Sequence, residues 1–215
     1  MYCSVQRLLL RSPLPIACSL IFAAHAAAPL ADWSYAPLRD DLRLTDLFQH
    51  DVESMNDRRI GRLRDVLVGE GGKFEAAVVE FDQGIGSGGY AIALMEWSDT
   101  VLEPASGSMT VSIGHDDQAP ETFNVEGVAA RDIIGRNVLL NDDEPFGRIS
   151  DILVDPEDQQ PSGLLVEFEG DIYALPFQAN GIQLADGPVR SAISRQAVET
   201  LGVFESDGME NRRRR

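Results

Sequence analysis

The sequence predicts a mainly β protein in which two small β-barrels stand in tandem and a short helix follows the second. Two observations support this fold class. A set of residue blocks recurs once along the chain in the same order, and each copy consists of short β-branched and aromatic runs separated by turn residues. A small sheet of such strands has exposed edges unless it curls, so we expect each copy to close into a barrel.

The first 26 residues have the pattern of a secretory signal peptide. Arg7 and Arg11 supply positive charge, an apolar stretch runs from Leu14 to Ala24, and Ala24 and Ala26 are small residues suited to cleavage. We expect cleavage after Ala26 and a periplasmic or secreted protein. The alternative is an uncleaved anchor, but the stretch is shorter than the about 20 apolar residues that span a bilayer.

Cleavage would remove both cysteines, Cys3 and Cys18. The mature chain would then have no disulfide, no cysteine nucleophile and no thiolate metal site. Residues 27–43 follow as a predicted flexible tether before the first repeat.

The repeat is visible at an offset of 86 residues around two Gly-Arg pairs. Ile60 to Val68 matches Phe146 to Val154, which places Gly61 with Gly147 and Asp65 with Asp151. Other blocks follow in the same order, with the offset changing only at loops. They pair Asp46-Leu47-Phe48 with Asp132-Ile133-Ile134, Val78-Val79-Glu80-Phe81 with Leu165-Val166-Glu167-Phe168, and Tyr90 to Leu94 with Tyr173 to Phe177.

The matched blocks set the predicted boundaries. Repeat 1 covers 44–114, a polar linker covers 115–129, repeat 2 covers 130–204, and a disordered tail covers 205–215. Gly61 and Gly147 suit a bulge or a sharp bend before a strand. Ser194 can cap a helix over Arg195 to Leu201, which Gly202 can end. A core shared by the repeats would make one rigid unit, whereas separate cores would leave a hinge in the linker.

These residues resemble the PRC-barrel family, named for a domain of the photosynthetic reaction centre H subunit. The resemblance rests on the Gly-Arg runs Ile60 to Val68 and Phe146 to Val154, and on the Tyr-Ala strands that begin at Tyr90 and Tyr173. The first copy departs from the pattern at Ala93, where proline is favoured. The resemblance implies a small β-barrel that acts as an assembly or adaptor module and is not an enzyme.

The charge of the chain excludes some partners. With 35 acidic and 18 basic residues the net charge is -17, so we expect no nucleic-acid partner and a well-solvated surface. The basic tail Arg212 to Arg215 allows at most a weak contact with an anionic membrane, or a contact with the protein's own acidic face. The oligomeric state is left open.

We expect no catalytic residue, no cofactor and no metal. His50 and His115 are far apart in sequence and lack metal-ligand spacing. The acidic runs Asn141 to Glu144 and Asp155 to Asp158 could gather a hard cation such as calcium, but they do not fit an EF-hand loop and resemble solvated turns. Recurrence of Asp65 and Asp151 indicates a role in the fold, through a backbone contact at a bend or pairing with a neighbouring arginine.

Trp97 and Phe177 lie near the ends of matched strands and are the candidate interaction surface, with burial in the core as the alternative. The fold signature consists of Gly61, Asp65, Tyr90, Gly147, Asp151 and Tyr173. Together these features predict an exported, non-enzymatic module whose partner is another protein. The alternative is an envelope protein that binds a cation or small ligand through its acidic loops.

Overall fold

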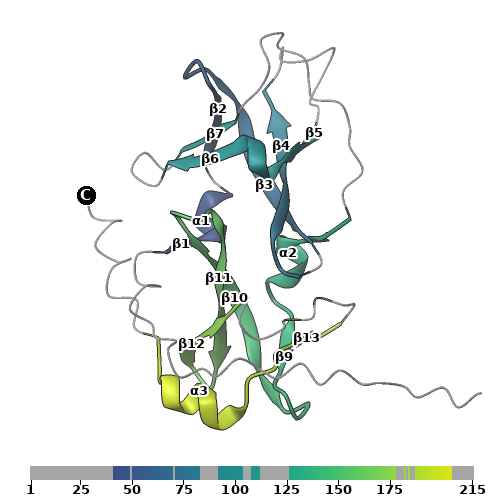
Figure 1. Cartoon of the computed structure of the whole chain (residues 1–215), viewed down its shortest axis with the longest axis vertical. Coiled ribbons are helices and arrows are strands. Elements are labelled where there is room, and N and C mark those ends of the chain that lie inside the picture. Colours follow the sequence, from purple (N-terminus) through teal and green to yellow (C-terminus); the bar gives the residue numbers. More distant parts are fainter. Residues whose placement is uncertain are drawn as a thin grey trace, which may run out of the picture.

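The computed structural model describes residues 41–48, 50–69, 71–82, 92–103, 108–111, 126–177, 182, 184 and 187–204. These residues form two β-sheets, one above the other in Figure 1, with short helices between the sheets and below the second one. The prediction of a mainly β protein is confirmed.

The first sheet is built mostly from the N-terminal half of the chain. Its strands are β2 (Asp51–Ser54), β3 (Arg59–Val68), β4 (Phe74–Phe81), β5 (Ile92–Glu96), β6 (Thr100–Glu103), β7 (Ser108–Val111) and β8 (Val128–Ala129). The order is β5-β4-β3-β2-β7-β6, and β8 pairs with β3 beside that path. Alternation along β4 turns Val79 and Phe81 into the core and Val78 and Glu80 outward.

The second sheet has the same plan. Its strands are β1 (Leu42–Arg43), β9 (Asn137–Leu139), β10 (Pro145–Asp155), β11 (Gln160–Phe168), β12 (Asp171–Pro176) and β13 (Val189–Arg190). The order is β12-β11-β10-β9-β13, with β1 paired to β10 beside that path. Asp65 faces Val78 and Asp151 faces Leu165, and each aspartate follows a register shift in its strand. The two long strands therefore bend at equivalent places.

The register of β5 and β12 corrects one part of the sequence alignment. Ala93 lies opposite Val79, whereas Tyr173 lies opposite Val166, the equivalent of Val79. Ala93 is thus the counterpart of Tyr173, and the match of Tyr173 to Tyr90 was wrong by three residues because the connections before these strands differ in length. Tyr90 itself lies outside the described residues. The same register makes Ile92 the counterpart of Ile172, and Trp97 the counterpart of Phe177.

Two glycines allow the bent strands to approach their neighbours. A Cβ atom on Gly61 would lie 2.2 Å from the carbonyl oxygen of Glu80, and one on Gly147 would lie 2.2 Å from that of Glu167. Gly147 also has a positive φ of 69°. Both glycines lie at register shifts against the preceding strand, β2 or β9, so the predicted bulges are observed.

The helices are short. α1 (Leu44–Leu47) and α2 (Ala130–Ile133) each form about one turn, η3 (Trp97–Asp99) is a 3₁₀ turn, and α3 (Arg195–Leu201) follows the second sheet. The Ser194 hydroxyl accepts a hydrogen bond from the Ala197 amide at 3.2 Å, and Gly202 follows with φ 78°. The predicted C-terminal helix is confirmed with its cap and its end.

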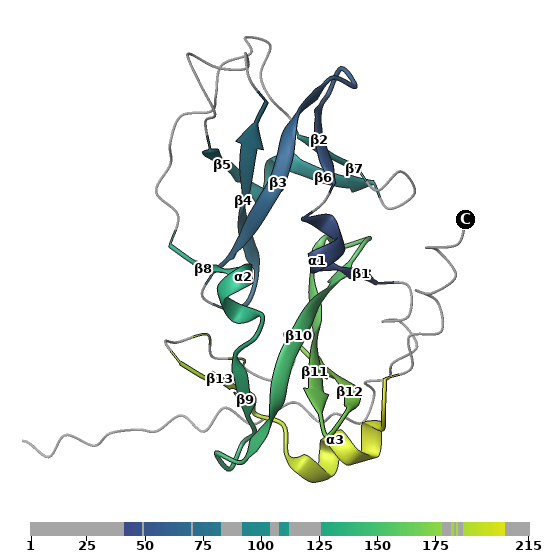
Figure 2. The same ribbon diagram turned by 180° about the vertical axis from the view of Figure 1, so that it is seen from behind.

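The segment that begins each half pairs with the sheet of the other half. β1 pairs antiparallel with β10, and β8 pairs antiparallel with β3. The partners are equivalent, because Arg43 faces Leu153 as Ala129 faces Leu67. We call Leu42–Leu47 and Val128–Ile133 the exchanged segments. Their helices α1 and α2 lie at the boundary between the sheets in both views (Figures 1 and 2).

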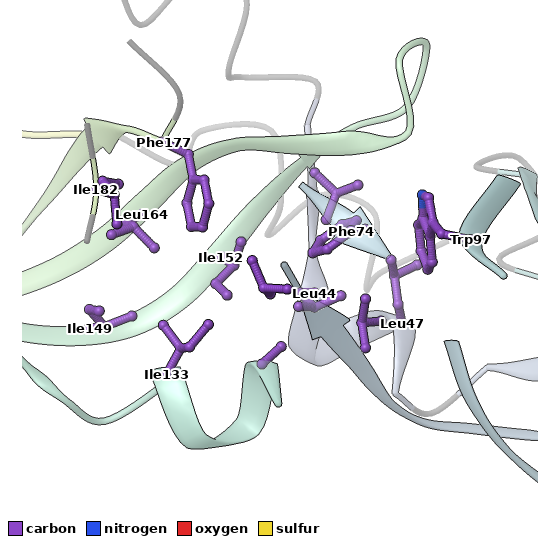
Figure 3. Close-up of a cluster of buried hydrophobic side chains, with 14 of the residues drawn as sticks. Leu44, Leu47, Phe74, Trp97, Ile133, Ile149, Ile152, Leu164, Phe177 and Ile182 are labelled. Atoms are coloured by element: carbon purple, nitrogen blue, oxygen red, sulfur yellow. The ribbon is translucent and has the colours of Figure 1, made fainter. Parts of the chain in front are cut away.

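One hydrophobic core joins the two halves. Leu44 and Leu47 from α1 and Ile133 from α2 are buried in a single cluster with side chains of both sheets. Figure 3 shows Leu44 between Ile152 of the second sheet and Phe74 of the first, with Leu47 toward Trp97 and Ile133 near Ile149. A continuous core opposes independent motion of the halves, so they pack as one unit.

Within the described ranges, neither sheet closes into a hydrogen-bonded ring. The first sheet ends at β5 and β6, and the second ends at β12 and β13. Closed barrels were expected because they shield strand edges and the inner face of a sheet. Here the inner faces are buried against the exchanged segments and the other half, so the apolar surface is covered without closure.

Candidate functional site

The predicted interaction surface at Trp97 and Phe177 is wrong. Only 4% of Trp97 and 1% of Phe177 is exposed, and both side chains belong to the shared core. Figure 3 places them on either side of the α1 leucines. The alternative, that these aromatics are core residues, is the one the structure supports.

Trp97 and Phe177 instead hold the two halves together. Trp97 Nε1 donates a hydrogen bond to the Gln159 carbonyl at 2.6 Å, and the side-chain oxygen of Gln160 accepts from the Phe74 amide at 3.0 Å. At the equivalent place a Cβ atom on Gly72 would lie 2.5 Å from the Phe177 ring. The turn after the long strand of each half therefore packs against the aromatic residue of the other half.

Asp65 and Asp151 bind the helices of the exchanged segments. Oδ1 of Asp151 accepts from the Thr45 amide at 3.2 Å and from the Ile152 amide at 2.8 Å, while Oδ2 accepts from the Thr45 hydroxyl at 2.5 Å. Asp65 accepts from the amides of Arg131 at 3.2 Å and Val66 at 2.8 Å.

The residue that begins each of these helices supplies no side-chain cap, so an aspartate from the other half takes that role. The backbone role predicted for the two aspartates is confirmed. Their arginine neighbours bind elsewhere, since Arg62 pairs with Asp51 and Arg148 donates to the Gly135 carbonyl.

Burial changes the acidity of both carboxyl groups. Burial raises the pKa of Asp151 above its ordinary value, and the hydrogen bonds from Thr45 and Ile152 offset only part of the effect. Burial raises the pKa of Asp65 in the same direction, against hydrogen bonds from Val66 and Arg131. Raised carboxyl pKa values are common at acid–base sites, but these two groups are occupied with capping helices.

A pH dependence of stability follows from the raised pKa of Asp151. The folded chain holds the Asp151 proton more tightly than the unfolded chain, so this stabilisation is complete below the ordinary aspartate pKa and is lost as pH rises through the folded-state pKa. We expect wild type to lose stability relative to Asp151→Asn as pH rises above the ordinary aspartate pKa, because the amide does not titrate. Urea unfolding of both proteins over this rise in pH measures the difference. A difference that is constant or changes in the opposite direction would contradict this assignment.

The acidic runs proposed for a cation are engaged within the protein. Asp143 forms an ion pair with Arg190, and Glu144 forms one with Arg195. Asp155 accepts from the amides of Glu157 at 2.7 Å and Asp158 at 3.2 Å, as a turn-forming aspartate does. Among the described residues, no three His, Cys, Asp or Glu side chains come together as a metal site. His115 and the Arg212 to Arg215 tail lie outside the described residues.

The outer faces of the two sheets differ in what covers them. In the second half Leu153, Leu165 and Ala174 are fully buried, because Phe204 packs on them together with Ile172. The amide of Phe204 donates to the Ile172 carbonyl at 2.7 Å, so the chain after α3 is fixed to the edge strand β12. We call this set the covered face.

The equivalent surface of the first half is the open face, formed by Leu67, Val78, Ile92 and Leu94. Ile92 is 65% exposed, and the other three are partly exposed. It lies on the outer side of β3, β4 and β5, and β5 is the last strand in the described part of its sheet. Apolar side chains clustered on the outer side of an edge strand are typical of a binding surface.

The open face was not identified from the sequence. A signal was present, because apolar residues on both faces of β4 and β5 predict a sheet covered on both sides. The difference between the two halves depends on Phe204, whose position on β12 requires the path of the chain after α3. No local pattern specifies that path.

Residues 126–189 match the PRC-barrel domain. The match covers the exchanged segment of the second half and the strands from β9 to the start of β13. No curated protein matches the chain. Within the described ranges, each helix falls short of the length and apolarity needed to cross a membrane.

Proposed function

We propose that this protein is an exported, non-enzymatic protein-interaction module made of two PRC-barrel-like units, residues 44–114 and 130–204. The domain match supports the second unit directly. The strand order, which is the same apart from β6, and the equivalent positions of Asp65 and Asp151 support the first. Export is supported by Arg7, Arg11 and the apolar stretch that ends in small residues at Ala26.

The observation that carries the binding function is the open face. Its equivalent in the second half is covered by a segment of the same chain, whereas Ile92 is largely exposed at the edge of the first sheet. An apolar surface beside an edge strand is suited to binding a segment of another chain. The open face has both features and therefore serves as a binding site for a partner.

The residues with the most perturbed chemistry favour binding over catalysis. Among the described residues, Asp65 and Asp151 are the carboxyl groups with raised pKa, and each accepts a hydrogen bond from a backbone amide of an exchanged segment. A general acid or base needs access to its substrate, and Asp151 is only 3% exposed, while Asp65 is engaged with the amides of Val66 and Arg131.

Replacement of Ile92 by aspartate is expected to abolish recovery of a partner when the protein is used to capture proteins from an envelope fraction. A charge on the open face prevents desolvation of the apolar contact, while the free energy of unfolding should change by less than about 0.5 kcal/mol because Ile92 is exposed. Crosslinking with mass spectrometry identifies the recovered protein, and urea unfolding checks the fold.

Val101→Asp is the matched control for this experiment. Val101 is 47% exposed and lies on β6, at the opposite edge of the same sheet. Partner recovery should survive this change. Equal loss of partner recovery in both variants would indicate a general effect of the added charge. Full partner recovery in both variants would show that the open face is not the binding site.

A further inference from the structure

The covered face shows how the protein fills this type of surface. The segment Gly202 to Phe204 leaves α3 and meets β12, where the Phe204 amide donates to the Ile172 carbonyl. The Phe204 ring then lies on Leu153, Leu165 and Ala174. Two contacts are combined here: one backbone hydrogen bond to the strand edge, and one large apolar side chain on the outer face.

The open face offers the same two contacts. Ile92 is equivalent to Ile172 in the strand register, so its carbonyl group occupies the position that receives the Phe204 amide in the second half. Leu67, Val78 and Leu94 are equivalent to the three residues under the Phe204 ring. In the described part of the first sheet, no strand pairs with the outer edge of β5.

We propose that the open face binds an extended segment of another protein, which donates a backbone N–H group to the Ile92 carbonyl and places a branched aliphatic side chain over Val78 and Leu94. Addition of an extended segment to a strand edge is a general mode of peptide recognition. This inference rests on the proposed function and specifies the partner's chemistry.

The size of the anchoring side chain follows from the residues beneath it. Leu94 replaces Ala174, and Ala76 replaces Gly163, so both positions are bulkier in the first half. Val78 stands where the second half has Leu165, and it is smaller by only one methylene group. The residues beneath the anchor are therefore bulkier in the open face than in the covered face, so we expect a leucine or isoleucine side chain to pack there better than a phenyl ring.

The net charge favours a different protein over a second copy as the partner. The chain carries a net charge of -17, so two copies repel each other. Beside Ile92 the charge of Glu80 is paired with Arg64, whereas Glu96 adds an exposed negative charge at the other end of β5. A segment with lysine or arginine next to its aliphatic anchor is attracted to this edge.

Three acetylated peptides test the proposal with the ¹⁵N-labelled full chain. The first is Lys-Gly-Val-Leu-Thr-Lys, the second has phenylalanine in place of the leucine, and the third has aspartate there. At millimolar peptide, the leucine peptide should shift the amide resonances of β5 and β4. It should bind about tenfold more tightly than the phenylalanine peptide, and the aspartate peptide should not bind.

Leu94→Ala is the specificity variant, because it restores the smaller residue found at Ala174. The phenylalanine peptide should become the tighter ligand of this variant. Val101→Asp should leave all affinities unchanged. Absence of shifts on β5 with every peptide, or an unchanged order of affinities in Leu94→Ala, overturns the proposal.

Two other occupants would also overturn it. If wild type is a dimer by light scattering and Ile92→Asp is a monomer, the open face binds a second copy. If nuclear Overhauser contacts join Ile92 to Phe123 in the free chain, residues 112–125 cover the face. Loss of partner capture in Ile92→Asp without peptide binding would leave the proposed function intact and reject only the extended-segment mode.

Discussion

Gly147→Ala is expected to lower the free energy of unfolding by about 3 kcal/mol or more, because the added methyl group meets two obstacles at once. The added Cβ atom would lie 2.2 Å from the Glu167 carbonyl oxygen, and the backbone at Gly147 has φ 69°. The clash with Glu167 forces β10 away from β11. The positive φ is a backbone conformation that alanine disfavours. Urea unfolding monitored by circular dichroism measures the loss.

Two other glycines separate these causes. Gly61 has the same 2.2 Å clash, with the Glu80 carbonyl oxygen, but no positive φ. Gly170 has φ 94° and no atom within 4 Å of the added Cβ. Gly170→Ala should cost about 1–2 kcal/mol, Gly61→Ala should cost more, and Gly147→Ala should cost the most. Equal losses of unfolding free energy in Gly147→Ala and Gly170→Ala would show that β10 and β11 relax to remove the clash.

Asp151→Ala is expected to cost about 3 kcal/mol, because it leaves the part-buried amide of Thr45 and the buried amide of Ile152 without their acceptor. Asp151→Asn keeps an acceptor for both amides and presents its NH₂ group to the Thr45 hydroxyl, so it should cost less than about 1 kcal/mol at neutral pH. Only 3% of Asp151 is exposed, so water does not replace the lost contacts. Urea unfolding at constant pH gives both values.

Asp65→Ala is the matched control, since Asp65 caps α2 as Asp151 caps α1. Asp65 is less buried and has no hydroxyl partner, because Arg131 stands where the other helix has Thr45. We expect about 1 kcal/mol for this variant. An Asp65→Ala effect as large as that of Asp151→Ala would show that burial does not set the cost.

The fold was predictable wherever a residue's role is local. Gly61 and Gly147 indicated bends, and Ser194 and Gly202 marked the ends of α3, because turns and caps depend on a few neighbouring residues. The repeat indicated that Asp65 and Asp151 serve the fold. It could not identify their partners, because Thr45 and Arg131 belong to segments that cross to the other half.

The candidate site was less predictable for a related reason. Trp97 and Phe177 were assigned to the surface because they end strands, but the surface at those ends is an interface within the chain. The exposed position of Ile92 could be recognised as the counterpart of Ile172 only from the strand register. Both errors concern contacts between halves, and no pattern within one repeat contains that information.

The exchanged segments determine when the protein can fold. Leu44 and Leu47 are near the beginning of the described chain, yet they are buried against β10, more than 100 residues later, and the Thr45 contact with Asp151 spans 106 positions. Leu44, Thr45 and Leu47 therefore lack these contacts until the ribosome has added β10. Contacts between such distant residues slow folding. A nascent chain of this protein therefore stays incompletely folded until β10 has been synthesised, because the helix that begins the first half is fixed by the second half.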